Sequence, residues 1–115
     1  MSLISALFGP SVPTMKPTEV QEKLKNGDRP FLLDVRENQE LGEGYISGSK
    51  LVPLRELSSR MKELPKDREI VCVCRSGNRS RSAARQLIAA GYSASNMKGG
   101  MLAWGWSKLP MKRGN

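Results

Sequence analysis

Histidine is absent from the sequence of 115 residues. Because histidine is the usual general acid and base at neutral pH, any reaction here must proceed without an imidazole. Attack of one sulfur on another suits this constraint, since a preformed thiolate needs no base and its leaving group can be a stable anion. Two cysteines without a histidine also cannot complete a tetrahedral zinc site, so we predict no metal.

Cysteine is scarce, and Cys72 and Cys74 are its only two positions. Two cysteines do not make a disulfide framework. On an extended strand their Cα atoms would lie about 6.6–7 Å apart, at or past the limit of disulfide geometry. A single domain of this length buries about two-thirds of its unfolded surface, so it needs no covalent staple.

Aromatic residues make up only 5% of the chain, although its net charge is +8. A basic domain binds phosphate backbones non-specifically, but here the positive residues are spread along the chain and no nucleic-acid motif is present. We therefore predict no nucleic-acid partner. The charge indicates an electropositive surface that favours small anionic substrates.

Long hydrophobic runs are also missing. The apolar patch at residues 1–8 is far too short to span a bilayer, and it lacks the basic flank of a signal peptide. We predict no membrane association and a cytoplasmic location. Gly9–Pro13 ends the patch, so residues 1–13 are predicted to form an N-terminal arm that lies on the domain or on a partner chain, as in a dimer.

A strand, a short loop and a helix surround the second cysteine. Residues 70–73 are apolar and mostly β-branched, which is typical of a strand buried on both faces. After a polar bend, a helix is predicted to start near residue 79 or 80, with one apolar stripe made of Ala83, Ala84, Leu87 and Ile88. Cys74 therefore stands where the strand ends and the loop begins.

This position favours a negatively charged sulfur. The first turn of a helix leaves backbone N–H groups without partners, and together they carry about half a positive charge. Gly77 tolerates the positive φ that would let the loop curl around the sulfur of Cys74. Arg75, Arg79 and Arg81 add positive charge. Such settings lower cysteine pKa values from about 8.5 to roughly 3.5–7.5, so we predict a nucleophilic thiolate.

The alternative for each cysteine is an inert place in the core, because free cysteines are among the most buried residues. Cys72 keeps that interpretation, since it lies inside the apolar run. Cys74 is predicted to be reactive, because the sequence Arg-Ser-Gly-Asn-Arg that follows it cannot continue a buried strand.

The rest of the chain alternates strands with helices. Further strands are predicted at residues 14–15, 31–35, 50–54 and 93–97, and helices at 16–25, around 39–41, at 55–64 and at 99–104. Leu57 and Met61 are predicted to face the core, which Trp104 or Trp106 covers. The alternation predicts one α/β domain at residues 14–110, a three-layer α/β/α fold with a central parallel sheet of about five strands. Residues from Leu109 onward, and above all the basic tail at 111–115, are predicted to have little structure.

Asp34 and Arg36 lie near the carboxyl end of the predicted strand at 31–35, on the edge where ligands bind in open α/β sheets. The default interpretation is a surface ion pair worth less than about 1 kcal/mol. A supporting role for the cysteine loop is the alternative.

Six short motifs between about Thr14 and Pro110 form a family pattern. They lie at 33–37, 44–48, 52–54, 74–80, 90–92 and 96–104, and the sequence Cys-Arg-Ser-Gly-Asn-Arg-Ser at 74–80 is the most specific. Together they resemble the single-domain rhodanese family, the thiosulfate sulfurtransferases, over nearly the whole chain.

The resemblance implies a persulfide mechanism without a cofactor. Cys74 would attack the outer sulfur of thiosulfate or a similar small anionic donor, release sulfite and hold the sulfur until a thiol, cyanide or an acceptor protein takes it. Arg75 would meet the sulfonate, Arg79 would close the loop, and the N–H groups would hold the persulfide charge. The substrate-binding set implied in this way is Arg75, Ser76, Gly77, Asn78, Arg79 and Ser80.

Three positions depart from the family pattern. Tyr45 and Ser47 stand where the family usually has histidine and proline, and Lys98 stands where it usually has glutamate. These changes lie outside the cysteine loop, so the active-site assignment carries over.

Two other functions compete with sulfur transfer. Cysteine-loop phosphatases carry Cys-x5-Arg, whereas the spacing here is Cys74-x4-Arg79, and Ser80 occupies the place that their arginine needs. The second competitor is a non-catalytic binding module, or a sulfur carrier that is loaded once and does not turn over.

Overall fold

The central sheet contains five strands among residues 11–113, the part of the chain that the computed structural model describes. In spatial order they are β1 (Thr14–Met15), β5 (Ala94–Met97), β4 (Ile70–Val73), β2 (Phe31–Asp34) and β3 (Lys50–Leu51). Every neighbouring pair is parallel. This confirms the predicted parallel sheet and places β4, which leads into the cysteine loop, at its centre.

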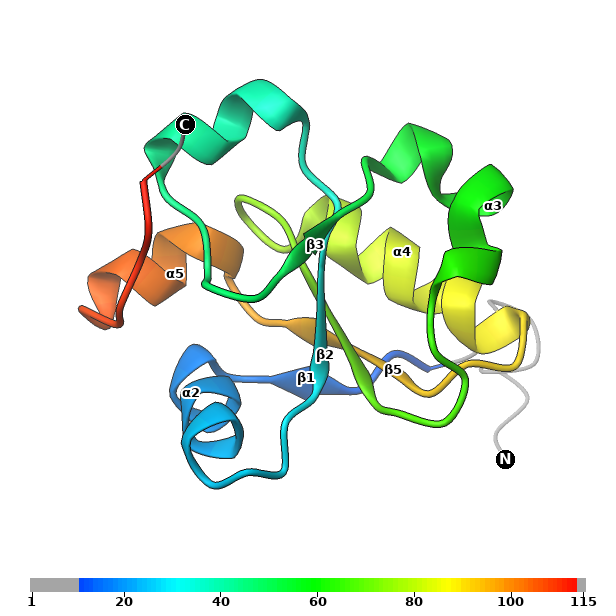
Figure 1. The fold of residues 1–115 in the computed structure, drawn as a ribbon, viewed down its shortest axis with the longest axis horizontal. Coiled ribbons are helices and arrows are strands. Elements are labelled where there is room, and N and C mark those ends of the chain that lie inside the picture. Colours follow the sequence, from blue (N-terminus) through cyan, green and yellow to red (C-terminus); the bar gives the residue numbers. More distant parts are fainter. Residues whose placement is uncertain (1–10, 114–115) are drawn as a thin grey trace.

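Helices cover both faces of the sheet (Figure 1). The face packed against α4 (Asn78–Ala89) also carries α3 (Leu57–Arg60), and the other face carries α2 (Pro17–Lys25) and α5 (Gly100–Trp106). Three 3-10 helices join them: η1 (Asn38–Glu43), η2 (Leu54–Glu56) and η3 (Met61–Glu63). No helix within residues 11–113 has the length and apolar character needed to cross a membrane.

Alternation along β4 divides the core between the two faces. Ile70 and Cys72 pack in the cluster with α4, whereas Val71 and Val73 pack in the cluster with α2 and α5. All four are buried, as the unbroken apolar run predicts. Burying a valine or isoleucine side chain contributes about 1.5–3 kcal/mol, so this strand anchors both helix layers. The same period of two places Cys74 on the α4 side.

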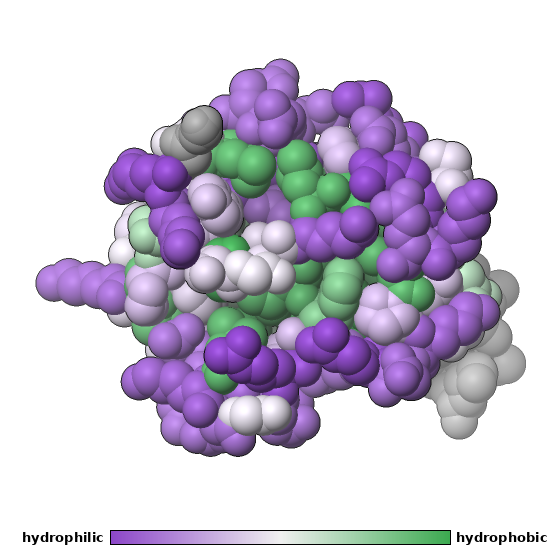
Figure 2. Space-filling view, viewed as in Figure 1, coloured by the Kyte–Doolittle hydropathy of each residue, from purple (hydrophilic) through white to green (hydrophobic). Residues whose placement is uncertain are grey.

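The strand predicted at 50–54 is shorter in the structure, because β3 ends at Leu51. The N–H of Val52 still donates to the carbonyl of Asp34, at 2.9 Å, and that of Leu54 to the carbonyl of Val35, at 3.1 Å, but the chain turns into η2 at Leu54. Figure 2, in the same view as Figure 1, shows hydrophilic side chains around the rim of this face and hydrophobic ones across its middle, where β3 crosses the view in Figure 1. β3 is an edge strand of the sheet. An edge strand this short leaves few unpaired backbone groups for another chain to pair with.

The helix predicted at 55–64 consists of three short pieces instead, η2, α3 and η3. Leu57 is buried as predicted, and Met61 packs partly buried against the same core. The end of the last piece has a local cause, because Pro65 cannot donate an α-helical N–H to the carbonyl of Met61. That carbonyl accepts the N–H of Leu64, at 3.0 Å, and the hydroxyl of Tyr92, at 2.8 Å.

Trp104 and Trp106 have opposite surroundings. Trp104 is fully buried and covers the core as predicted, while Trp106 is 78% exposed. The indole N–H of Trp104 donates to the carbonyl of Pro110 at 2.8 Å, which ties the chain after α5 to the core. Trp106 leaves its side chain at the surface beside the site described below.

The C-terminal segment corrects a prediction. Lys112 forms an antiparallel bridge with Tyr45, in which each N–H donates to the other residue's carbonyl, at 2.8 and 2.9 Å. Met111 packs partly buried against the core. The expectation of little structure from Leu109 onward is therefore wrong up to Lys112, because backbone pairing with a distant segment orders it. Residues 1–10 of the predicted arm, and with them the proposed dimer contact, lie outside the described residues.

The start of α5 lies directly on the cysteine loop. The N–H of Met101 donates to the carbonyl of Cys74 at 2.8 Å, and the N–H of Leu102 donates to that of Arg75 at 3.0 Å. Gly100 has a φ of 58°, and a Cβ at this position would contact the carbonyls of Cys74 and Arg75, the latter at 2.5 Å. Only glycine allows this approach.

We expect Gly100→Ala to lower the free energy of unfolding by at least about 2 kcal/mol, because the new methyl group meets backbone in a left-handed conformation. Chemical denaturation measures the change. Gly42→Ala is the matched control, since its Cβ would meet nothing within 4 Å. Equal stability of the two variants would contradict this close contact.

Candidate active site

Cys74 follows β4 directly, at the carboxyl edge of the sheet. Its Sγ accepts hydrogen bonds from the backbone N–H of Gly77, at 3.1 Å, and of Ser80, at 3.3 Å. The hydroxyl oxygen of Ser80 lies 3.2 Å from the same sulfur. Gly77 has a φ of 106°, which is the conformation that the curled loop requires. The side chain therefore points into a ring of donors, as the sequence predicts.

These donors lower the pKa of the Cys74 thiol. Cys74 is fully buried, and burial alone raises a thiol pKa because it disfavours the charged form. A hydrogen bond that the Ser80 hydroxyl can donate to the ionised sulfur, and those from the N–H groups of Ser80, Gly77 and Ser76, act in the opposite direction and outweigh burial. The pKa of the thiol therefore lies below the ordinary cysteine value.

The other cysteine has the opposite environment. Burial within the sheet, with a smaller contribution from the neighbouring Cys74, raises the pKa of Cys72 to about 12. Both thiols are free. Cys72 is thus a neutral core residue, in agreement with the inert interpretation of its sequence context.

Asn96, on β5, is a buried part of the site that the sequence analysis missed. Its Oδ1 accepts a hydrogen bond from the Ser80 hydroxyl at 2.5 Å, and its Nδ2 donates to the carbonyl of Gly77 at 3.1 Å. Asn96 reaches the loop because β5 pairs with β4 in a register that sets it beside Cys72. Its signs in the sequence were a polar side chain in a predicted strand and a place in the family motif at 96–104.

Asp34 and Arg36 form a buried ion pair, so the default interpretation as a surface pair is wrong. Their side chains are 2% and 1% exposed, and Arg36 binds the carboxylate through Nε at 2.9 Å and Nη2 at 2.7 Å. Arg36 also donates to the carbonyls of Glu40 and Gly44, at 3.3 and 2.9 Å. The pair is buried because η1 folds over it. Removing one partner of such a pair costs about 3–5 kcal/mol, so it is a firm support for η1.

Arg79 joins the cysteine loop to η1. Its two Nη atoms bind the two carboxylate oxygens of Glu40, at 2.7 and 2.8 Å. Hydrogen bonding to Arg79 is the largest cause that lowers the pKa of Glu40 from 4.5 to about 2, so the carboxylate stays charged near neutral pH. Arg79 thus links the cysteine loop to η1, and the buried pair of Asp34 and Arg36 lies beneath the segment that carries Glu40.

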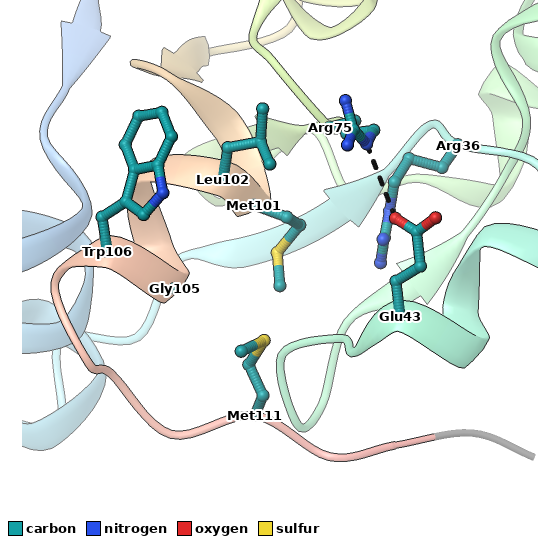
Figure 3. Close-up of a pocket in the computed structure, with 8 residues that line it drawn as sticks. All are labelled: Arg36, Glu43, Arg75, Met101, Leu102, Gly105, Trp106 and Met111. Carbon is teal, nitrogen blue, oxygen red and sulfur yellow. Dashed lines mark ion pairs between the residues drawn. The ribbon is translucent and has the colours of Figure 1, made fainter.

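A cleft of about 210 Å³ lies beside Arg75, the residue that follows Cys74 (Figure 3). Arg75 is 51% exposed at its wall and pairs with Glu43 at 3.5 Å. Figure 3 shows the two side chains facing each other across from the residues of α5. The apolar part of the lining comes from α5 and the C-terminal segment: Met101, Leu102, Trp106 and Met111. An anion that binds Arg75 must compete with Glu43, a carboxylate that the sequence analysis did not single out.

The structure does not bring all six predicted substrate-binding residues to the sulfur. Gly77 and Ser80 donate hydrogen bonds to it, and the N–H of Ser76 also lowers its pKa. Arg79 turns to η1, and Arg75 turns to the cleft just described. Ser76 and Asn78 are exposed, and with Arg81 and Lys98 they line a second cleft of about 350 Å³. The loop therefore directs backbone N–H groups at the sulfur on its inner side, and it presents the side chains of Ser76 and Asn78 to solvent on its outer side.

A parallel α/β sheet with a low-pKa cysteine, held by backbone N–H groups at the carboxyl edge, defines a class of proteins that use a thiolate as a nucleophile. The model of the rhodanese-like domain matches residues 16–105. The chain belongs to this family, as its motifs predict.

Individual relatives agree with this assignment. A sulfurtransferase of Allochromatium vinosum is 36% identical over 93 residues, which cover 80% of this chain and 87% of that protein. The structure of a rhodanese-related protein from Thermoplasma volcanium is 30% identical, with a TM-score of 0.81 and coverage of 87% of this chain and 97% of that one. A rhodanese-like domain protein from Staphylococcus aureus is 32% identical, with a TM-score of 0.79 and coverage of 88% and 99%. These relatives support a role in sulfur transfer.

The ion pair between Glu40 and Arg79 predicts a pH dependence. A carboxylate whose pKa is lower in the folded state stabilises the fold above its unfolded pKa, and this contribution is lost as pH falls through the folded pKa. We expect Glu40→Gln to lower the free energy of unfolding by roughly 1 kcal/mol at neutral pH, a value reduced by partial exposure. The difference from wild type should hold down to about pH 4.5 and vanish near pH 2.

Urea denaturation at a series of pH values measures this difference, and Arg79→Gln should show the same convergence because it removes the other partner. A constant difference between pH 2 and pH 7 would mean that the ion pair is not its source.

Proposed function

We propose that the protein moves a sulfane sulfur from thiosulfate, or a similar small anionic donor, to a thiol, cyanide or an acceptor protein. The observation that carries the proposal is the Sγ of Cys74, which accepts backbone hydrogen bonds from Gly77 and Ser80. Such donors stabilise an anionic sulfur before and after it is loaded. No cofactor and no histidine are needed, because both half-reactions exchange one sulfur anion for another.

The reaction has two displacement steps. The Cys74 thiolate attacks the outer sulfur of thiosulfate, a new sulfur–sulfur bond forms, and the old one breaks as sulfite leaves with the electron pair. An acceptor thiolate or cyanide then attacks the outer sulfur of the persulfide, and Cys74 leaves as a thiolate. Because Cys74 is fully buried at rest, side chains around the loop must move to admit the donor.

The loop favours this chemistry over phosphate ester hydrolysis. The ring from Cys74 to Arg79 is one residue shorter than a phosphatase loop, which suits a smaller group than phosphate. Both Nη atoms of Arg79 are also bound to Glu40, so a phosphate would have to compete with this carboxylate for the guanidinium. Hydrolysis of an aryl phosphate would revive the phosphatase hypothesis.

Turnover distinguishes an enzyme from a sulfur carrier. Steady-state release of sulfite from thiosulfate, with cyanide or a thiol as acceptor, is expected for the enzyme. Loading of one sulfur per chain without turnover would identify a carrier that hands its sulfur to a specific partner. The cytoplasmic location stays a prediction from the sequence.

Cys74→Ser should abolish sulfur transfer and leave the fold intact, because the hydroxyl is not ionised at neutral pH. After treatment with thiosulfate, mass spectrometry of the wild type should show a gain of about 32 Da, one persulfide sulfur, on the peptide that contains Cys74. Cys72→Ser is the matched control and should lower stability more than activity, since its thiol is a neutral core group. Sulfur transfer by Cys74→Ser would refute the assignment of the nucleophile.

Arg75→Ala should raise the KM for thiosulfate with a smaller effect on kcat, because it removes a cation from the wall of the cleft of about 210 Å³. A loss of about 3- to 5-fold in kcat/KM corresponds to about 0.6–1 kcal/mol, as expected for a partly exposed charge. Arg81→Ala changes the net charge equally and serves as the control. Identical thiosulfate dependence in the wild type and in Arg75→Ala would exclude this role.

A further inference from the structure

Asn96 is held in one orientation by its two buried hydrogen bonds. Its Nδ2 faces the carbonyl of Gly77, at 3.1 Å, which only a donor can satisfy. Its Oδ1 must therefore face Ser80, whose hydroxyl oxygen lies 2.5 Å away. An amide oxygen is only an acceptor, so the hydrogen between these two atoms comes from the Ser80 hydroxyl.

This assignment leaves no hydrogen for a second donation by Ser80. A serine hydroxyl has one hydrogen and two lone pairs, and the hydrogen is engaged with Asn96. The hydroxyl oxygen, 3.2 Å from the Sγ of Cys74, then presents a lone pair to the sulfur. That arrangement fits a neutral thiol, whose S–H donates to the hydroxyl, and it repels a thiolate or a persulfide anion.

We propose that Asn96 is a positioning residue that keeps the Ser80 hydroxyl as an acceptor for the protonated form of Cys74, and that the hydroxyl turns to donate to the sulfur once it is an anion. On ionisation the S–H bond breaks, the proton goes to water, and the electron pair stays on sulfur. The O–H of Ser80 then rotates from Oδ1 of Asn96 toward Sγ. The step in sulfur transfer that this assists rests on the proposed function, whereas the effect on the thiol does not.

Two features of the surroundings let the hydroxyl turn without loss of the loop. The carbonyl of Gly77 also accepts a hydrogen bond from the N–H of Arg81, at 3.2 Å, so it keeps a donor when Asn96 is substituted. Asn96 lines the cleft of about 350 Å³ that Ser76 and Lys98 also line, and water there can hydrate the amide after the hydroxyl has left.

The charged and titratable groups around this network are known. Cys72 on β4 and Arg79 on α4 are two ionisable groups that interact with the Cys74 charge. Arg81 and Lys98 share the cleft with Asn96. Substitutions at Asn96 and Ser80 leave all four in place, so these groups do not account for a difference among the variants.

The test is a double-mutant cycle read by the ultraviolet absorbance of the thiolate as a function of pH, with Cys74→Ser as the blank. Asn96→Ala frees the hydroxyl to donate to sulfur, so the pKa of Cys74 should fall and its thiolate population below that pKa should rise about 3- to 10-fold. In a Ser80→Ala background the same substitution should leave the titration unchanged, because the hydroxyl that transmits the effect is gone.

Two results would overturn the proposal. A pKa of Cys74 that is unchanged or higher in Asn96→Ala shows that Asn96 does not withhold the hydroxyl. An equal shift with and without the Ser80 hydroxyl shows that Asn96 acts only through the shape of the loop. Asn96→Val, which is β-branched and suited to a strand, repeats the measurement if Asn96→Ala does not fold.

The titration needs no sulfur donor, so it separates this inference from the proposed function. Coupling between Asn96 and Ser80 without any loading of wild-type Cys74 by thiosulfate would retain the inference and refute sulfur transfer. Loading and turnover by the wild type without coupling would refute the inference alone.

Discussion

Two backbone N–H groups, of Gly77 and Ser80, point at the sulfur of Cys74 from within the first turn of α4 and the bend before it. Hydrogen bonds to a buried anion are strong, because the low local dielectric that makes an unpaired charge costly also strengthens its partners. The site needs this, since Cys74 is buried on the α4 side of the sheet. If these donors moved away, burial would leave a neutral thiol of the kind that Cys72 presents.

The rest of the fold keeps those donors in place from three sides. Asn96 on β5 holds Gly77 and Ser80, and the N-terminus of α5 binds the carbonyls at the start of the loop. The third support runs through η1, where Glu40 binds Arg79 and the buried pair of Asp34 and Arg36 lies underneath. Each support comes from a different segment of the chain, so the geometry of the loop is set by the whole sheet edge. A reactive sulfur that must be preorganised requires such support.

The local part of this site could be predicted from the sequence. The apolar run before Cys74, the stripe of α4 and the glycine with positive φ are all encoded within about twenty residues, where periodicity and turn chemistry decide the structure. The helix begins at Asn78, one residue before the predicted start, which is within the fraying of helix boundaries.

The remainder depends on contacts between distant segments. Asp34 and Arg36 share one face of a strand end, but nothing near them in the sequence shows that η1 would cover them. Asn96 reaches Ser80 only through the register of β5 on β4, and Lys112 is ordered only by its bridge to Tyr45. Burial of a polar group is a property of the tertiary fold, so sequence pattern alone leaves it undetermined.

The most direct measurement of the central claim is the titration of the wild-type Cys74 thiol, by thiolate absorbance against pH with Cys74→Ser as the blank. The hydrogen bonds from the loop predict a pKa clearly below the ordinary cysteine value, with Cys72 silent until far higher pH. A Cys74 pKa at or above that ordinary value would show that burial outweighs the loop donors, and it would contradict the account of a nucleophilic sulfur.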